Sequence, residues 1–183
     1  MLRFLDFIFA FFGLLFLWPV LLVITIIGYF DTGSPIFLQT RVGRKQKPFT
    51  LIKFRTMAVD TASVATHLLK KDNATKLGRF LRKTKLDELP QLINVLKGEM
   101  SLVGPRPGLF NQHELIAARA KKDIYKVRPG ITGLAQISNV DMSTPVKLAE
   151  LDAKMIRTFT VKHYFKYILA TVTGGGSGDR LQG

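Results

Sequence analysis

The stretch FIFAFFGLLFLWPVLLVITIIGYF, from Phe7 to Phe30, carries no formal charge. A straight helix of this length extends about 36 Å, against about 30 Å for the hydrocarbon core of a bilayer. A core helix of a soluble domain is the competing interpretation, but an uncharged terminal run so rich in Phe favours a membrane segment. A secretory signal is not indicated, because Arg3 is offset by Asp6 and no small-residue cleavage site follows.

Pro19 divides this run into two halves that are each too short to cross a membrane. Proline removes one backbone hydrogen bond and clashes with the preceding turn, so we expect a kink there. Two topologies stay open. The residues alone favour a kinked helix that spans the membrane over a re-entrant hairpin that leaves by the face it entered.

The chain as a whole is strongly basic, with 27 Lys and Arg against 13 Asp and Glu and a net charge of +14. This excess predicts an anionic partner, either nucleic acid, anionic lipid or a phosphorylated substrate. The absence of cysteine excludes disulfides and thiol nucleophiles, and the scattered histidines do not have metal-ligand spacing. Basic residues after the apolar run predict that this side is cytoplasmic: Arg41, Arg44, Lys45, Lys47, Lys53 and Arg55.

The rest of the chain predicts a mainly helical α+β fold. Strands are expected at Ile36–Gln39 and Phe49–Phe54, on either side of a basic turn, and form a short β-hairpin. Helices are expected within 67–85, in two pieces broken near Asp72–Asn73, and within 87–100, 113–125 and 144–173. The stretch 104–108 is a stiff Pro/Gly loop, and 127–137 is a second Pro/Gly-rich segment that ends in a short strand.

Two of these helices carry further detail. The helix within 87–100 should place four apolar residues on one face and stop at Gly98: Leu89, Leu92, Ile93 and Leu96. The last helix mixes aromatic residues such as Phe165 with lysines such as Lys166. It suits either an amphipathic helix in the membrane interface or a packing helix with snorkelling lysines, and both interpretations stay open.

An acidic pair, Asp87–Glu88, stands in the basic stretch RKTKLDELPQL (82–92). One interpretation is structural, because Thr84 and Asp87 have the spacing of a capping box. The other is functional. Pro90 belongs in a first helical turn, where the macrodipole and nearby cations favour ionised carboxylates. Such carboxylates suit nucleophilic attack or magnesium binding, and neighbouring helical residues diverge by about 100°, so the two acids would have different roles.

Several basic side chains could bind the phosphate groups of a substrate. The planar fork of arginine suits diphosphate oxygens. Together with the membrane segment, these side chains indicate chemistry on a phosphorylated substrate at a membrane, which is a class of substrate and not a reaction. The candidates are Lys53, Arg55, Arg82, Arg106 and Arg128.

Three blocks, KFRTM (53–57), KLDELPQLINVLKGEMSLVGPRP (85–107) and VRPGITGLAQI (127–137), resemble the signatures of the bacterial sugar transferases. These are monotopic phosphoglycosyl transferases that initiate glycoconjugate assembly, and the resemblance extends from the apolar run to about Thr173. It implies transfer of a sugar-1-phosphate from a UDP-sugar to polyprenyl (undecaprenyl) phosphate, with release of UMP. It further implies Mg²⁺ as cofactor, a covalent phospho-sugar–aspartate intermediate and ping-pong kinetics. The product would begin an O-antigen, capsule, exopolysaccharide or glycoprotein glycan, and family habit suggests an N-acetylated amino sugar.

The resemblance also assigns roles to individual residues. Asp87 would be the nucleophile, Glu88 would bind Mg²⁺, and Arg82 would contact the acceptor phosphate. Pro105 and Pro107 would shape the loop that presents Arg106 to phosphate. Arg128 would lie near the nucleotide, while Lys53 and Asp152 match further polar positions of the family.

The resemblance changes the expected topology, because the family's first helix breaks at a residue–Pro pair, here Trp18–Pro19, and re-enters the cytoplasmic leaflet. The family's usual residue before this proline is Ser, so Trp18 is a departure. The chain would comprise a re-entrant anchor (1–32), a catalytic domain on the cytoplasmic face of the bacterial inner membrane (33–173) and a flexible Gly-rich tail (174–183). Expected partners are a UDP-sugar, polyprenyl phosphate and membrane lipid, with a homodimer left open and no nucleic acid.

Two interpretations from other classes compete with the enzyme. A membrane-anchored protein could bind anionic lipid or nucleic acid through its basic residues, and it would need neither the acidic pair nor magnesium. A catalytically silent homologue could act as an assembly scaffold, but the intact Asp87–Glu88 pair disfavours this. No nucleic-acid motif is present.

Overall fold

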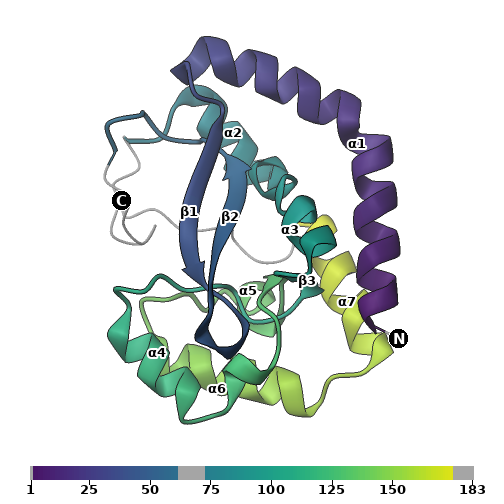
Figure 1. Ribbon diagram of the computed structural model, residues 1–183, viewed down its shortest axis with the longest axis vertical. Helices are drawn as coiled ribbons and strands as arrows, with labels where there is room; N and C mark the ends of the chain where they lie inside the picture. The colour runs from purple at the N-terminus through teal and green to yellow at the C-terminus, as the bar shows by residue number, and fades with distance from the viewer. Residues whose placement is uncertain (1, 62–72, 175–183) are drawn as a thin grey trace.

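The computed structural model describes residues 2–61 and 73–174 and has a mainly helical α+β architecture with two small sheets (Figure 1). The helical piece expected from residue 67 to the break, Asp72 at that break and the Gly-rich tail beyond Gly174 lie outside the described residues. The elements are α1 (Leu2–Thr32), β1 (Ile36–Val42), η1 (Arg44–Gln46), β2 (Pro48–Phe54), α2 (Lys76–Thr84), η4 (Leu86–Glu88), α3 (Gln91–Lys97), β3 (Ser101–Val103), α4 (His113–Ala120), η5 (Ile124–Lys126), β4 (Gly130–Thr132), α5 (Leu134–Ile137), α6 (Pro145–Arg157) and α7 (Val161–Val172).

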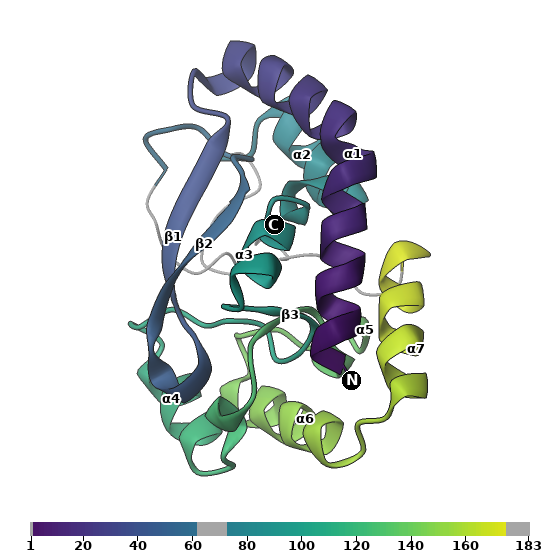
Figure 2. The ribbon, with the colours of Figure 1, turned by 45° about the vertical axis from the view of Figure 1, so that its right-hand side comes forward.

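Helix α1 is one helix that bends part-way along its length and contains Pro19 (Figures 1 and 2). The expected helix break is therefore a bend, because a proline removes a single backbone donor and the turns on either side persist. Both halves of α1 contact the rest of the protein. Ala10 packs in one core cluster with Leu92 of α3, and Ile24 packs in another with Leu81 of α2.

A buried carboxylate fixes the N-terminal end of α1. Asp6 Oδ1 accepts hydrogen bonds, each 3.0 Å long, from Ser101 Oγ, from the Leu102 amide and from the Tyr164 hydroxyl of α7. Burial, reinforced by the Asp6 carboxylate, raises the pKa of Tyr164. Arg3, one turn earlier, donates to the Val95 carbonyl at 2.6 Å. Asp6, which the sequence analysis treated only as a charge offset, thus joins α1 to β3 and α7.

Strands β1 and β2 form the predicted antiparallel hairpin, with Ile36 opposite Phe54 and Val42 opposite Pro48. β1 extends three residues beyond the expected end at Gln39, because ladder pairing continues to the turn at η1. Asn94 of α3 ties the hairpin to the body. Its Nδ2 donates to the Thr50 carbonyl at 2.7 Å, and its Oδ1 accepts from the Ile52 amide at 3.1 Å.

Helix α3 stops at Gly98 as predicted, in the left-handed conformation (φ +84°). Its buried face differs from the expected one. The buried residues are Gln91, Leu92, Asn94 and Val95, while Ile93 is 37% exposed. The face is set by the amide contacts of Asn94 with β2, which apolar periodicity does not reveal.

The second sheet pairs β3 with β4 in parallel, with Ser101 beside Gly130 and Val103 beside Thr132. Gly130 lies so close to the Gly104 backbone that a Cβ there would overlap it, so a side chain at this position would separate the strands. A strand was expected at the end of the segment 127–137, but the strand, β4, lies at the centre of that segment. Residues 134–137 form the short helix α5 instead. The predicted 144–173 region forms two helices, α6 and α7.

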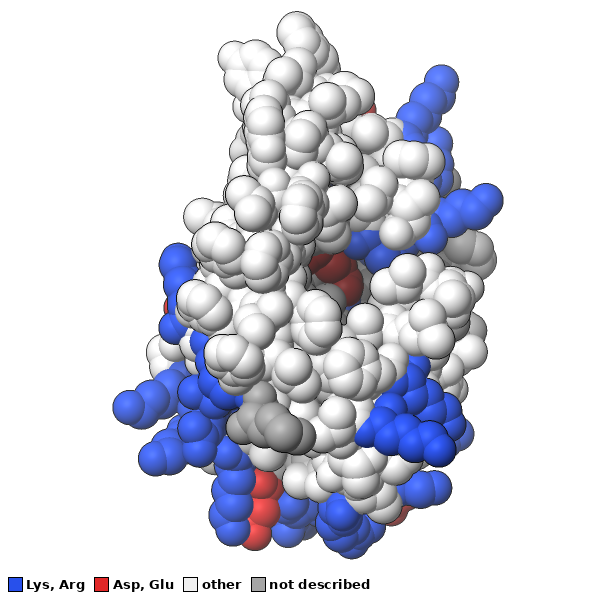
Figure 3. Space-filling model, turned by 90° about the vertical axis from the view of Figure 1, so that its right-hand side faces the viewer, with Lys and Arg blue, Asp and Glu red and all other residues white. Residues whose placement is uncertain are grey.

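One face of the molecule, formed largely by α1 and α7, is broadly uncharged. Figure 3 shows this face with Lys and Arg at its margins and a hollow with acidic side chains at its base. Both helices expose large apolar side chains, including Phe16 and Phe30 of α1 and Leu169 and Val172 of α7. α7 buries Tyr164 and exposes these others, so it both packs on the protein and contributes to the apolar face. By length and composition α1 could cross a membrane.

Candidate active site

The acidic pair lies in η4, a single 3-10 turn between α2 and α3. Lys85 precedes it in the left-handed conformation (φ +59°) and reverses the chain after α2. The predicted capping box is wrong, because Thr84 belongs to the last turn of α2 and its hydroxyl donates to the Phe80 carbonyl at 2.9 Å. The pair nevertheless stands at the N-terminal side of α3, as expected.

The two acids have different surroundings. Asp87 is buried, with 7% of its surface exposed. Glu88 lines a pocket beside α7, and its Oε1 accepts a hydrogen bond from Arg106 Nη2 at 2.6 Å. The side chains of this ion pair are 12% exposed in Glu88 and 21% exposed in Arg106. Arg106, predicted to bind phosphate, thus lies against Glu88.

A buried ion pair holds the loop that carries Arg106. Arg119 of α4 donates from Nη1 to the Arg106 carbonyl at 2.8 Å, and from Nε and Nη2 to Asp152 Oδ2 at 2.9 and 2.7 Å. Burial raises the pKa of Asp152, and Arg119 opposes this shift. Asp152, a predicted polar site residue, therefore supports the loop from within the protein. The sequence analysis missed Arg119, although it lies four residues after the buried Leu115 on the same helical face.

Basic residues of the hairpin and α2 border the acidic turn, since η4 contacts both β2 and α2. Lys53 of β2 is buried, with its ammonium 5.4 Å from the centre of the Phe37 ring. Arg82 of α2 donates from Nε to Thr56 Oγ1 at 2.8 Å. The structure thus brings Arg106 to Glu88, and it packs the elements that carry Lys53 and Arg82 against the acidic turn.

A further arginine from β1, which the sequence analysis used only as a topology signal, reaches the same loop. Arg41 is buried and donates from Nη1 to the Pro107 carbonyl at 3.1 Å. Its Nη2 donates to Gln39 Oε1 at 2.6 Å. Gln39 and Arg41 alternate along the strand and face inward, a period-two pattern that could have marked them as interior polar residues.

The family comparison agrees with this arrangement, because the model described as bacterial sugar transferase matches residues 1–175. The chain belongs to the bacterial sugar transferase family. Three relatives illustrate the range of matched proteins. An uncharacterized sugar transferase, EpsL, of Bacillus subtilis is 43% identical over 141 residues, which are 76% of this chain and 69% of the relative.

The other two relatives are longer proteins. The galactosyl transferase CpsE of Streptococcus agalactiae is 38% identical over 184 residues, covering 93% of this sugar transferase and 41% of the relative. The UDP-glucose:undecaprenyl-phosphate glucose-1-phosphate transferase of Escherichia coli is 41% identical over 182 residues, covering 93% of this chain and 39% of the relative. The chain thus spans less than half of the length of both.

Two predicted phosphate-binding arginines of the sugar transferase are engaged elsewhere. Arg55 donates from Nε to the Ser34 carbonyl at 2.8 Å, and its guanidinium lies 5.3 Å from the centre of the Phe37 ring. It therefore holds the base of the hairpin. Arg128 donates from Nε to the Gly98 carbonyl at 2.8 Å, which places it at the C-terminal end of α3.

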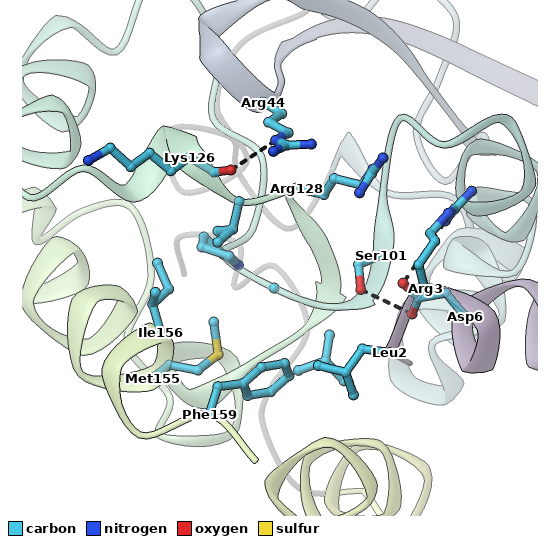
Figure 4. A pocket seen from close by; sticks show the side chains of 14 residues that line it. Leu2, Arg3, Asp6, Arg44, Ser101, Lys126, Arg128, Met155, Ile156 and Phe159 are labelled. Atoms are coloured by element: carbon cyan, nitrogen blue, oxygen red, sulfur yellow. Dashed lines mark hydrogen bonds and ion pairs between the residues drawn. The ribbon is translucent and has the colours of Figure 1, made fainter. Parts of the chain in front are cut away.

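Arg128 lines a separate pocket of about 300 Å³ together with Arg3 and Arg44 (Figure 4). Burial and the nearby charges of Arg3 and Arg44 lower the pKa of Arg128. Ser101 and Val103 line this pocket, whereas Leu102, between them on β3, lines the pocket of Glu88. The two pockets share no lining residue. The structure does not bring Arg128 into the pocket of Glu88.

The predicted magnesium site depends on the carboxylate donors that the structure supplies. Among residues 2–61 and 73–174, no group of three or more His, Asp or Glu could hold a metal by itself. Magnesium in proteins is commonly held by one or two carboxylates and completed by substrate phosphates and water. Glu88, with Asp87 beside it, fits this type of site and does not fit an all-protein cage.

Proposed function

We propose that this sugar transferase moves a sugar-1-phosphate from a UDP-sugar to polyprenyl phosphate and releases UMP. The observation that carries the proposal is the buried Asp87 next to the Glu88–Arg106 ion pair, in a turn that packs against the strand of Lys53 and the helix of Arg82. The E. coli relative, whose name states such a transfer to undecaprenyl phosphate, supports the same class of reaction. Phosphoryl transfer depends mainly on positioning and charge neutralisation, to which the Arg106 guanidinium beside the acidic turn would contribute.

In the first half-reaction, a carboxylate oxygen of Asp87 attacks the sugar-linked β-phosphorus of the donor. The bond between this phosphorus and the bridging oxygen breaks, and UMP leaves with that oxygen. The sugar-1-phosphate is then joined to Asp87 as an acyl phosphate, a mixed anhydride. Arg106 and Arg82 bind the phosphate oxygens, and the buried position of Asp87 limits hydrolysis of the anhydride.

In the second half-reaction, a phosphate oxygen of the polyprenyl phosphate attacks the same phosphorus. The bond to the aspartyl oxygen breaks, which regenerates the Asp87 carboxylate and yields a polyprenyl diphosphate sugar. Glu88 would hold a magnesium ion together with substrate oxygens, and such an ion neutralises charge on the phosphates. The Arg106–Glu88 ion pair keeps the carboxylate of Glu88 oriented beside the site of transfer.

The names of two relatives mention a sugar. One is a UDP-glucose:undecaprenyl-phosphate glucose-1-phosphate transferase and the other a galactosyl transferase. An N-acetylated amino sugar stays a prediction, as do the Mg²⁺ requirement, the homodimer and the glycan that the product begins.

We also propose that α1 is re-entrant, with the catalytic body on the cytoplasmic face of the inner membrane. Both halves of α1 contact the same body, through Ala10 in one and Ile24 in the other. A helix that carried its second half straight across a bilayer would lose the second set of contacts. The Lys and Arg residues at the margins of the apolar face suit the anionic cytoplasmic leaflet.

The test is a UMP-release assay on the purified full chain with undecaprenyl phosphate, Mg²⁺ and a panel of UDP-sugars that includes glucose, galactose and N-acetylated amino sugars. The proposal predicts release with at least one donor and its loss on chelation of Mg²⁺ by EDTA. A lipid- or nucleic-acid-binding protein would release no UMP with any donor.

A further inference from the structure

A second feature of the Glu88 region is an apolar pocket of about 340 Å³ between η4, α3, α7 and the β3–β4 sheet. Its volume is within the usual range of small-molecule sites, about 300–1,000 Å³. Its walls are mainly aliphatic. Leu86 and Leu89 line one side, Leu102 and Ile131 the sheet side, and Ile168 and Val172 the α7 side.

The pocket also contains two opposite charges from adjoining parts of the acidic turn. Glu88 is its carboxylate, and Lys85 is its cation. Lys85 Nζ donates to the Thr171 carbonyl of α7 at 3.3 Å, so the ammonium lies between η4 and α7. Desolvation lowers the pKa of Lys85, and the carboxylate of Glu88 opposes this shift. An aliphatic pocket with a cation beside the catalytic turn suits a ligand with an apolar chain and an anionic head.

The pocket adjoins the apolar face of the molecule. Val172, in its lining, is 78% exposed, and Leu169 on the same helix is 64% exposed. Figure 3 shows the hollow with acidic side chains at its base within this face. An amphiphile in the membrane can therefore reach the pocket sideways without crossing a charged surface.

We propose that this pocket receives the first isoprenyl units of the acceptor lipid, which enters from the membrane between α3 and α7 and places its phosphate beside Lys85 and Glu88. The inference rests on the proposed function. It adds the path by which the acceptor lipid enters and the residues that line its binding site. Lys85 binds the phosphate head in addition to the contact expected from Arg82, and Ile131 and Ile168 bind the chain. The acceptor thus reaches Glu88 through a pocket that shares no lining residue with the Arg128 pocket.

The kinetic test narrows the pocket with Ile168→Trp and uses Leu169→Trp as the matched control, because Leu169 is the exposed neighbour outside the lining. The KM for undecaprenyl phosphate is measured in detergent with the active UDP-sugar. One methylene more or less in a hydrophobic pocket changes substrate discrimination by about 10-fold or more. Because tryptophan is larger than isoleucine by more than a methylene, Ile168→Trp should raise this KM by at least about 10-fold. Leu169→Trp should leave it unchanged.

A second measurement isolates the donor half-reaction from the acceptor. Exchange of labelled UMP into the UDP-sugar needs no acceptor, and Ile168→Trp should retain it, which also shows that the variant is folded. If the wild-type protein shows neither UMP exchange nor sugar-phosphate transfer, the proposed function itself is contradicted. If the wild-type protein is active and Ile168→Trp leaves the KM for undecaprenyl phosphate unchanged, only the pocket assignment is contradicted.

Lys85→Asn tests the head-group contact, since asparagine tolerates the left-handed backbone that residue 85 adopts. Loss of the ammonium should raise the KM for undecaprenyl phosphate by about 10-fold and leave the KM for the UDP-sugar unchanged. A rise confined to the UDP-sugar would assign Lys85 to the donor and overturn this part of the inference.

A binding experiment identifies the occupant directly. The probe is a polyprenyl phosphate with a photoreactive diazirine in its first isoprenyl unit, incorporated into phosphatidylglycerol vesicles with the wild-type protein. We expect cross-links within 84–92 and 168–172, reduced by unlabelled undecaprenyl phosphate and not by added phosphatidylglycerol. Suppression by phosphatidylglycerol would make the pocket a phospholipid site, and cross-links confined to other regions would contradict the proposed route.

Discussion

Glu88 and Arg106 are joined by a hydrogen-bonded ion pair of 2.6 Å across 18 positions of the sequence. This contact connects the acidic turn after α2 with the Pro/Gly loop after β3. A buried Arg119–Asp152 pair supports the loop from behind through the Arg106 carbonyl. The candidate site therefore depends on contacts among parts of the chain that are far apart in sequence.

The Glu88–Arg106 pair should act as a unit in the reaction. We expect Glu88→Gln and Arg106→Met each to reduce UMP release by about 10²-fold or more, because each removes a charge beside the phosphates. The double variant should lose less than the product of the two effects, since the residues are coupled. A double-mutant cycle on kcat/KM measures this, with Glu114→Gln, an exposed glutamate of α4, as the control. Purely multiplicative losses would contradict the coupling.

The Arg119–Asp152 pair should matter for stability as well as activity. Arg119 is 2% exposed and Asp152 1% exposed. Asp152→Ala would leave the Arg119 charge buried without its partner, at a cost of about 3–5 kcal/mol in the free energy of unfolding. Thermal unfolding in detergent measures the loss. The exposed Asp31→Ala provides the control, and equal stability of the two variants would be inconsistent with a supporting role for the pair.

Asp6 should anchor α1 more strongly than an acid on the helix surface. Its Oδ1 accepts three hydrogen bonds from β3 and α7. We expect Asp6→Ala to lower the free energy of unfolding by about 2–4 kcal/mol and to increase proteolysis of α1, because buried donors lose their acceptor. Limited proteolysis in detergent, with Asp31→Ala beside it, measures this. Identical digestion patterns would argue against the anchor.

Alkaline pH should destabilise the protein through Tyr164. Its pKa is raised in the folded state by burial and by Asp6, so the hydroxyl keeps its proton while an unfolded tyrosine loses one above about pH 10. The unfolded state then binds fewer protons, and the free energy of unfolding falls as pH rises. Tyr164→Phe should reduce this slope between about pH 10 and 11. Parallel slopes for variant and wild type would refute the assignment.

The sequence predicted the elements around the site better than their detailed contacts. The hairpin and the stop of α3 at Gly98 follow from local patterns, whereas the contact of Arg106 with Glu88 was found only in the structure. The capping box failed because Thr84 bonds backward within α2, a choice that spacing does not distinguish. The burial of Asp6 and the orientation of the Asn94 side chain were not predictable, since both depend on contacts with strands that are distant in sequence.

The predicted phosphate-binding arginines show the same difference between local patterns and tertiary contacts. The sequence marks each of them as a possible phosphate ligand, but only the tertiary structure shows which groups each one contacts. Arg106 contacts Glu88, Arg82 donates to Thr56, Arg55 holds the hairpin and Arg128 binds the end of α3. Arg41 reaches the Arg106 loop because its strand continues past the predicted end.

The most direct test of the account is the chemical identity of the intermediate. The full chain is incubated with the active UDP-sugar, labelled in the sugar, without acceptor, and then digested for peptide mass spectrometry. We predict one sugar-phosphate on the peptide that contains Asp87, none in Asp87→Asn, and release of the label on addition of undecaprenyl phosphate. Turnover near the wild-type rate in Asp87→Asn, or label on a different residue, would contradict Asp87 as the nucleophile.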